Sequence, residues 1–206
     1  MFTKGLSPQT QSNLELLSES PIVKRYYLAG GTALSLHFGH RFSNDLDFFS
    51  QHPKNPLALR SGLASLGRLE ILQNEEGTFN GIFNQIKLGL FVYPYPLLFP
   101  TLDFKGINVA DILDIACMKV DAISSRGTKR DFIDLYFICQ KTKPLREILS
   151  LYIKKYSSAK FNKLHILKSL IYFEDSEEDA MPEMLEEVSW EEVKKFFVGK
   201  TRDLEF

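Results

Sequence analysis

Leu28-Ala29-Gly30-Gly31-Thr32-Ala33-Leu34 is followed, after a short polar loop, by Arg41-Phe42-Ser43-Asn44-Asp45-Leu46-Asp47-Phe48-Phe49. In the first stretch, a glycine pair at the start of a predicted helix offers backbone N–H groups to phosphate. In the second, two aspartates alternate with apolar residues along a predicted strand and place two carboxylates side by side for a divalent metal. Together the two stretches predict a nucleoside triphosphate site.

The Asp-x-Asp pair is the candidate metal centre. Side chains at i and i+2 of a strand share a face, with Cα atoms about 6.6 Å apart, so Leu46 and Phe48 are expected to point into the core. Because Asp45 and Asp47 repel each other when uncompensated, a cation between them is favourable. Mg²⁺ or Mn²⁺ suits two carboxylates plus substrate phosphates. The alternative for an isolated pair is the exposed polar face of an edge strand.

The residues around the glycine pair are the candidate phosphate-binding groups. Gly30 and Gly31 are expected to hold the far end of the triphosphate through their amides. Thr32 adds a hydroxyl, or else caps the helix. Arg41 and Ser43 lie in the loop before the strand, where the guanidinium is placed to reach phosphate or, equally, to be solvated.

The amino-acid composition limits the class of protein to which such a site can belong. The chain has 206 residues, 44% of them hydrophobic and 13% aromatic, which is typical of one compact domain or two small ones. A formal charge of −1 gives no global basic field for nucleic acid. Cys117 and Cys139 lie in apolar helical patterns without zinc-site spacing, so we expect buried reduced thiols. With no apolar N-terminal segment and an apolar run at 89–100 broken by prolines, we expect a cytoplasmic protein without a membrane span.

Periodicity and turn residues predict an α+β N-terminal half and an all-helical C-terminal half, with domains at 1–105 and 106–206. Helix starts are marked by Ser7-Pro8 and Asn55-Pro56. The prolines of 93–96 mark the exit from the sheet. Strands are expected at 25–29, 45–49, 68–73, 77–83 and 85–93, and helices at 32–38, 109–125, 128–141, 145–156, 162–173 and 190–202.

A second constellation spans 119–136, where two predicted helices meet. Thr128 and Asp131 have the spacing of a capping box, and Asp131 and Asp134 are one turn apart on one face. Three basic residues gather at the junction of the helices. The alternative is a solvated helix hairpin with i,i+3 pairs. The basic residues are Arg126, Lys129 and Arg130.

Three motifs follow one another along the chain: Leu-Ala-Gly-Gly-Thr-Ala-Leu, then Arg-x-Ser-x-Asp-Leu-Asp-Phe-Phe, then Lys-x-x-Ala-x-x-x-Arg-Gly-x-Lys-Arg-Asp-Phe-x-Asp-Leu-Tyr. In this order they closely resemble the motifs of the AbiEii-type nucleotidyltransferases. These are the toxin-like branch of the DNA polymerase β nucleotidyltransferase superfamily. The resemblance implies a polymerase β-like mixed sheet with flanking helices, followed by a C-terminal helical bundle. By the same resemblance, Gly31 and Thr32 match the phosphate motif, Asp45 and Asp47 the metal ligands, and the pair contributed by the helical half is Lys119 and Asp131.

The resemblance also implies an activity and partners. We expect Mg-dependent transfer of an NMP from an NTP to an acceptor hydroxyl, such as an RNA or tRNA 3′ end, with Lys119 offsetting developing charge. Arg126, Arg130 and Asp134 are expected to contribute to nucleotide binding. A bacterial or mobile-element origin and a cognate antitoxin protein are implied as well, as in toxin–antitoxin and abortive-infection systems.

One position departs from the superfamily pattern. A third carboxylate is usual on a later strand, where it acts as general base and as ligand to a second metal. Gly89 stands at the matching position here. If Asp131 does not take over as base, the alternative is a weak or inactive module of the same fold that binds NTP or a partner protein.

Other classes fit less well. A haloacid dehalogenase phosphatase normally has Thr or Val where Phe49 stands, and a nucleotide-sugar glycosyltransferase places a larger α/β unit before its Asp-x-Asp. No predicted helix has the basic face of a DNA-recognition helix. The segment 174–192 carries ten carboxylates among nineteen residues and no basic side chain. We expect it to face solvent, or alternatively to bind a positively charged antitoxin surface.

Overall fold

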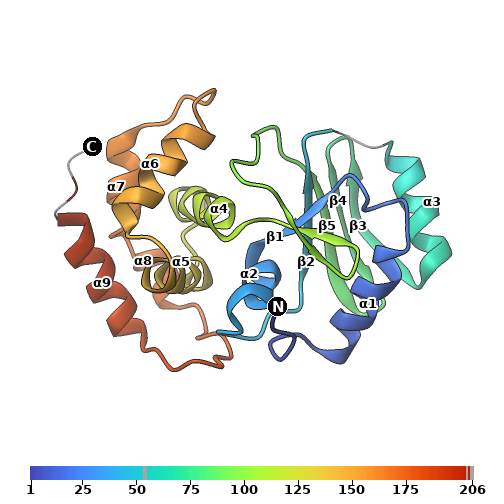
Figure 1. Cartoon of the computed structure of the whole chain (residues 1–206), viewed down its shortest axis with the longest axis horizontal. Helices are drawn as coiled ribbons and strands as arrows, with labels where there is room; N and C mark the ends of the chain where they lie inside the picture. Colours follow the sequence, from blue (N-terminus) through green and yellow to red (C-terminus); the bar gives the residue numbers. More distant parts are fainter. Residues whose placement is uncertain (53–54, 203, 205–206) are drawn as a thin grey trace. The chain divides into compact units, whose positions relative to one another are not determined.

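The computed structural model describes residues 1–52, 55–202 and 204. The chain forms two compact units, Met1–Asp111 and Ile112–Phe206, which are described separately (Figure 1). The units divide after Asp111, whereas the sequence predicts a division after residue 105. Two short strands in 102–109 belong to the sheet of the first unit.

Within the described residues, the first unit contains one seven-stranded mixed sheet with the order β3-β4-β5-β2-β1-β7-β6. Two of its pairings are parallel, β2 with β5 and β1 with β7, and the others are antiparallel. The strands are β1 (Tyr27–Ala29), β2 (Leu46–Ser50), β3 (Leu69–Glu75), β4 (Thr78–Phe83), β5 (Ile86–Val92), β6 (Leu102–Phe104) and β7 (Ile107–Val109).

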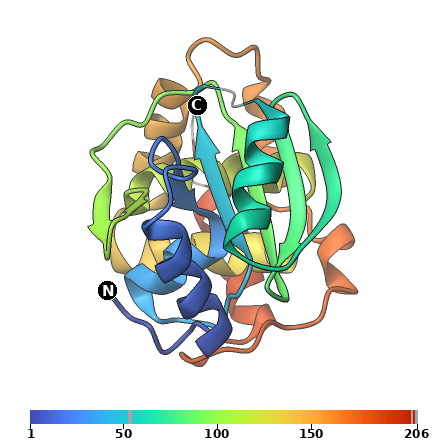
Figure 2. The same cartoon turned by 90° about the vertical axis from the view of Figure 1, so that its right-hand side faces the viewer.

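Three helices accompany this sheet: α1 (Pro8–Ser18), α2 (Gly30–Phe38) and α3 (Pro56–Leu66). The predicted starts of α1 and α3 are confirmed. The Ser7 hydroxyl accepts from the Thr10 amide at 3.1 Å, the Asn55 side chain accepts from the Leu57 amide at 2.9 Å, and a proline follows each cap. Figure 2 shows α1 and α3 in front of the sheet.

Alternation along β2 sets the two faces of the sheet at the candidate site. Leu46 and Phe48 are fully buried, while Asp47 and Phe49 are half-buried on the opposite face. The predicted orientation of this strand is therefore confirmed. The face that carries Asp47 extends onto β5, which pairs with β2 in parallel.

The hairpin of β6 and β7 was not predicted, and the expected helix start at Val109 is wrong. Lys105 and Gly106 both have positive φ, as a two-residue hairpin turn requires. Val109 pairs with Leu28 of β1, so a contact distant in sequence keeps it extended. The helix begins at Ile112 instead.

The second unit is helical: α4 (Ile112–Ser125), α5 (Lys129–Lys141), α6 (Leu145–Lys155), α7 (Lys163–Ser169), α8 (Glu174–Glu177) and α9 (Trp190–Arg202). The predicted helix 162–173 is too long. α7 ends at Ser169, and Phe173 packs its ring 5.2 Å from Phe132 and 5.7 Å from Trp190, which requires the chain to leave the helix axis.

This unit contains a buried ion pair and two free thiols. Lys155 Nζ of α6 lies 2.6 Å from Asp114 Oδ1 of α4, and both side chains are fully buried. Cys117 is buried and Cys139 half-buried, and both are free. Burial raises the pKa of each thiol to about 12.

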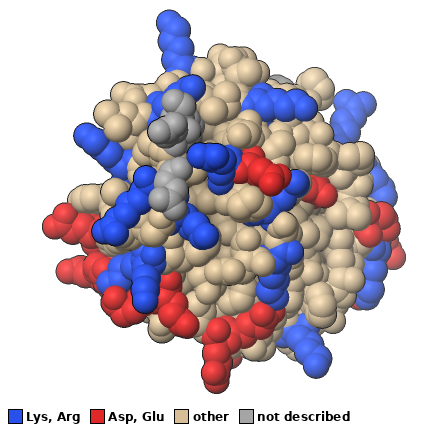
Figure 3. Space-filling view, turned by 60° about the vertical axis from the view of Figure 1, so that its left-hand side comes forward, with Lys and Arg blue, Asp and Glu red and all other residues tan. Residues whose placement is uncertain are grey.

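The acidic segment 174–192 forms ion pairs within its own unit. Lys194 Nζ lies 2.8 Å from Glu177, and Lys141 Nζ lies 2.5 Å from Glu186. On the face drawn in Figure 3, Lys and Arg are interspersed with Asp and Glu, without a continuous field of one sign. None of the described helices is both long and apolar enough to cross a membrane.

Candidate active site

The start of α2 lies beside the Asp-x-Asp pair. Ala29, the last residue of β1, pairs with Asp47 of β2, and α2 follows at once with Gly30. Gly30 has a φ of +70°, and a Cβ built there would lie 3.2 Å from Asp47 Oδ2. Glycine is therefore favoured at position 30 both by backbone conformation and by the space next to the carboxylate.

The second glycine leaves room for two polar side chains at the helix N-terminus. A Cβ at Gly31 would overlap Nη2 of Arg41 and lie 2.9 Å from Ser43 Oγ. Arg41 is buried, and its Nη1 donates to the Phe42 carbonyl at 3.0 Å. A guanidinium beside the positive end of a helix dipole concentrates positive charge there, next to the Asp47 carboxylate.

Gly31→Ala is expected to lower the free energy of unfolding by roughly 1–3 kcal/mol, because Arg41 has to move away from the added methyl group. The matched control is Gly199→Ala in α9, where a Cβ meets no atom within 4 Å. That change is expected to stabilise the protein by about 0.5–1 kcal/mol through helix propensity. Urea unfolding measures both; wild-type stability of Gly31→Ala would contradict the placement of Arg41.

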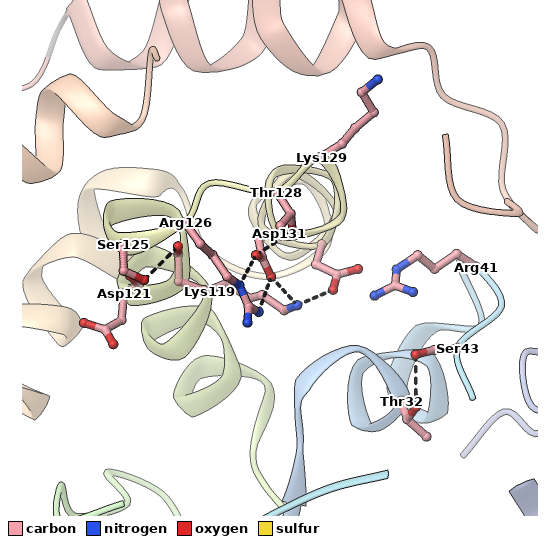
Figure 4. Close-up of polar contacts among 12 residues, drawn as sticks. Thr32, Arg41, Ser43, Lys119, Asp121, Ser125, Arg126, Thr128, Lys129 and Asp131 are labelled. Atoms are coloured by element: carbon pink, nitrogen blue, oxygen red, sulfur yellow. Dashed lines mark hydrogen bonds and ion pairs between the residues drawn. The ribbon is translucent and has the colours of Figure 1, made fainter. Parts of the chain in front are cut away.

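Thr32 holds the loop that carries Asp45. Its hydroxyl donates to the Asp45 carbonyl at 2.5 Å and lies 3.0 Å from Ser43 Oγ, as Figure 4 shows for the second contact. Thr32 is 1% exposed and makes no capping hydrogen bond, since the N-cap residue is Ala29. Its contact with phosphate stays a prediction.

The N-terminal segment fixes the same loop. Asn44 Oδ1 accepts from the Ser7 amide at 3.0 Å and from the Thr10 hydroxyl at 3.1 Å. The Ser43 amide donates to the Gly5 carbonyl at 2.9 Å. The approach to Asp45 is therefore preorganised by contacts on both sides.

Asp45 and Asp47 open into a pocket of about 370 Å³ on the sheet face of the first unit. Its wall includes three polar side chains that sequence reasoning missed: Gln73 of β3, Asn80 of β4 and Lys87 of β5. Asn80 Nδ2 donates to Gln73 Oε1 at 3.2 Å. The signal that identifies Lys87 is alternation, because it shares a strand face with Gly89.

Gly89 lies beside Asp47, as the parallel register of β2 and β5 pairs them directly. A Cβ at Gly89 would overlap the Phe91 ring and lie 3.1 Å from Asp47 Oδ1. The position of a third carboxylate is therefore next to the pair, and an aromatic ring covers it. Among the described residues, no group of three or more His, Cys, Asp or Glu side chains is placed to hold a metal ion.

The donor set still fits a magnesium ion. Mg²⁺ retains several waters and takes one or two carboxylates together with substrate phosphates, so two aspartates suffice on the protein side. The backbone amides at the N-terminus of α2 follow Ala29, which pairs with Asp47, so phosphates that accept from these amides would lie next to a cation on the aspartates.

The second unit holds a cluster of buried charges at the junction of α4 and α5 (Figure 4). Lys119 Nζ lies 2.9 Å from Asp131 Oδ1 and 2.6 Å from Asp134 Oδ2, and all three side chains are at most 7% exposed. Arg126 Nε contacts Asp131 Oδ2 at 3.1 Å, yet its side chain is 66% exposed. Arg126 is therefore the solvent-exposed member of this otherwise buried cluster.

At this junction, the side chains of Thr128, Lys129 and Arg130 make contacts that differ from those predicted from the sequence. Thr128 is the N-cap residue, but its hydroxyl donates to the Asp131 carboxylate at 2.7 Å, so the predicted capping box is wrong. Lys129 is buried and donates to the carbonyls of Glu177 and Asp179. Arg130 is exposed. The three basic residues thus do not form one cluster.

Burial would raise the pKa of Asp131, but the charges of Lys119 and Arg126 and a hydrogen bond from Thr128 lower it to about 2. A carboxylate held so strongly in its charged form is a poor general base. This weighs against Asp131 as the group that activates an acceptor hydroxyl and favours a positioning role toward Lys119 and Arg126.

The lowered pKa predicts a pH dependence of stability. Because the folded value lies below the ordinary 3.8, ionised Asp131 stabilises the fold above about pH 4, and this contribution of about 2 kcal/mol is lost as the pH falls to about 2. The difference in unfolding free energy between wild type and Asp131→Asn should shrink over that range. Glu178→Gln, at an exposed site, is the control. A difference that stays constant with pH would contradict the cluster geometry.

Comparison with known proteins identifies the family. The model of the AbiEii nucleotidyltransferase toxins, type IV toxin–antitoxin system, matches residues 14–206. The chain belongs to the AbiEii family. An uncharacterized protein of Aquifex aeolicus (strain VF5) is 38% identical over 97% of this chain and 98% of its own length. The predicted family is thereby confirmed.

Two solved structures share the fold of this AbiEii member. MenT4, a nucleotidyltransferase toxin of Mycobacterium tuberculosis H37Rv, matches 96% of this chain and 84% of its own, with a TM-score of 0.63 and 16% identity. A candidate nucleotidyltransferase of Helicobacter pylori matches 95% of this chain and 94% of its own, with a TM-score of 0.58 and 21% identity. The predicted polymerase β-like α+β fold is also confirmed.

Proposed function

We propose that this AbiEii-family chain transfers an NMP from an NTP to an acceptor hydroxyl, in the presence of Mg²⁺ or Mn²⁺, and that the acceptor is an RNA 3′ end such as that of tRNA. The observation that carries the proposal is the pairing of Ala29 with Asp47, because it sets the N-terminus of α2 directly beside the Asp-x-Asp pair. The groups proposed to bind phosphate and the carboxylates proposed to bind the metal are therefore adjacent.

In this proposal the amides of Gly30 and Gly31 hold the terminal phosphates, and Arg41 neutralises part of their charge. Asp45 and Asp47 hold the cation, which when bound neutralises charge on the triphosphate and polarises its α-phosphoryl group. The acceptor hydroxyl attacks the α-phosphorus in line. A new P–O bond forms, the bond to pyrophosphate breaks, and the hydroxyl proton passes to solvent water.

The second unit contributes charge in this proposal. Lys119 is assigned to offsetting negative charge on the nucleotide, with Asp131 and Asp134 orienting its ammonium group. Arg126 and Arg130 are exposed and are assigned to binding the nucleotide or the acceptor.

The family description supports a further partner. A toxin of a type IV toxin–antitoxin system implies a cognate antitoxin, and we propose that this chain has one and acts in the cytoplasm of a bacterium. If the acidic segment 174–192 binds a basic antitoxin surface, added salt should weaken the complex.

A second candidate function rests on Gly89. Because an aromatic ring covers the place of the third carboxylate, the chain is alternatively a module that binds NTP or a partner without turnover. Incubation with each labelled NTP, Mg²⁺ and total RNA separates the two. Label transferred to RNA supports the proposed reaction, whereas saturable retention of NTP without product supports the binding module.

A further inference from the structure

The pocket beside Asp45 and Asp47 is lined by a positively charged side chain, Lys87, to which no role has been assigned so far. Of the charged residues lining this pocket in the described part of the chain, two are the aspartates and the third is Lys87. Lys87 is exposed, and it forms no ion pair within the described residues. An ammonium group beside two carboxylates is therefore available to an anion that enters the pocket.

The strand register places Lys87 next to the aspartates. In the parallel pairing of β2 with β5, Leu46 lies opposite Leu88 and Asp47 opposite Gly89. Asp45 immediately precedes Leu46, the first residue of β2, and Lys87 immediately precedes Leu88 on β5. Neighbouring strands lie about 4.8 Å apart, so the two residues are close together. Alternation then puts Lys87 on the same sheet face as Gly89.

Position 89, where a third carboxylate would hold a second cation, carries no side chain. A side chain at position 89 would start 3.1 Å from Asp47 Oδ1, but the Phe91 ring already occupies that space. Two aspartates match one Mg²⁺ with its waters and phosphates. Among the described residues that line the pocket, no further carboxylate completes a second site. Without another positive charge, the charge that develops at the entering oxygen and the α-phosphoryl group would be poorly compensated on this side.

We propose that Lys87 supplies the positive charge on the acceptor side of the Asp45–Asp47 pair, in place of a second metal ion. The inference rests on the proposed nucleotidyl transfer and names a further residue of that site. As the acceptor oxygen bonds to the α-phosphorus and pyrophosphate departs, Lys87 Nζ donates hydrogen bonds to the entering oxygen and to a non-bridging oxygen of the α-phosphoryl group. Its proton stays on the amine, and the proton of the hydroxyl passes to water.

The first test needs no turnover. The full chain is titrated with Mn²⁺ in the presence of a non-hydrolysable NTP, and bound Mn²⁺ is counted by electron paramagnetic resonance. We expect one magnetically isolated Mn²⁺ per chain. Because Lys87 repels a cation on the aspartates, Lys87→Ala should bind Mn²⁺ about fivefold more tightly, whereas Lys87→Arg and the exposed control Lys24→Ala should match wild type. A coupled Mn²⁺ pair in wild type, or unchanged affinity in Lys87→Ala, would overturn the inference.

The second test measures labelled NMP transfer. Lys87→Ala should lower kcat about 100-fold with nucleotide affinity within about threefold of wild type, and Lys87→Arg should keep activity within about tenfold. A wild-type rate in Lys87→Ala refutes the inference while leaving the proposed function intact. A wild-type chain that shows the expected Mn²⁺ response but transfers no label to any acceptor refutes the proposed function instead.

Discussion

Asp45→Asn and Asp47→Asn are each expected to lower kcat for nucleotidyl transfer about 1,000-fold, equivalent to about 4 kcal/mol of transition-state stabilisation. Each change keeps the shape of the side chain but removes one negative charge from a pair that is suited to hold the cation. The structure describes the surroundings of the Asp47 carboxylate more fully, because it borders both Gly30 and Gly89. Transfer of labelled NMP to RNA, measured at saturating NTP and Mg²⁺, gives the rates.

The matched control is Glu19→Gln, which removes one negative charge from an exposed position at the C-terminal end of α1, in the same unit. Its rate should equal that of wild type. Thermal unfolding of each variant checks that the fold is intact. An undiminished rate in either aspartate variant would exclude a metal site that needs both carboxylates as ligands.

Lys155→Met is expected to lower the free energy of unfolding by about 3–5 kcal/mol, the largest stability effect we predict. The change leaves the Asp114 carboxylate fully buried without the ammonium group 2.6 Å away. A charge that loses its partner in the interior of a protein keeps its desolvation cost. Urea unfolding followed by circular dichroism gives the difference.

Two further variants make this prediction specific. Lys154→Met removes the adjacent, exposed lysine of α6 and should change stability by less than about 0.5 kcal/mol. The double replacement Asp114→Leu with Lys155→Met removes both charges and should destabilise less than Lys155→Met alone. If Lys155→Met is as stable as wild type, the pair is not buried in solution.

Local signals predicted the parts of the fold that local physics decides. The Ser7-Pro8 and Asn55-Pro56 caps fix helix starts through hydrogen bonds within three residues, and alternation at Leu46 and Phe48 fixes the buried face of β2. The β6–β7 hairpin was missed because its place in the sheet depends on the pairing of Val109 with Leu28, which no local pattern encodes.

The candidate site was predicted only in part for the same reason. The sequence identifies Asp45, Asp47 and the glycine pair, because each lies in a short motif. It does not reveal that the Thr32 hydroxyl bonds to the loop, since that contact depends on how the loop folds back onto α2. Alternation with Gly89 sets the strand face of Lys87, but its closeness to Asp45 depends on the pairing of β2 with β5, which neither strand alone reveals.

We propose that the Asp-x-Asp pair and the N-terminus of α2 hold one metal–triphosphate together. Crystals grown with Mn²⁺ and a non-hydrolysable NTP test it most directly, by anomalous diffraction at the manganese edge. We expect an anomalous peak between Asp45 and Asp47, with phosphate density at the amides of Gly30 and Gly31. Nucleotide density elsewhere, or no manganese at the aspartates under saturating nucleotide, would contradict it.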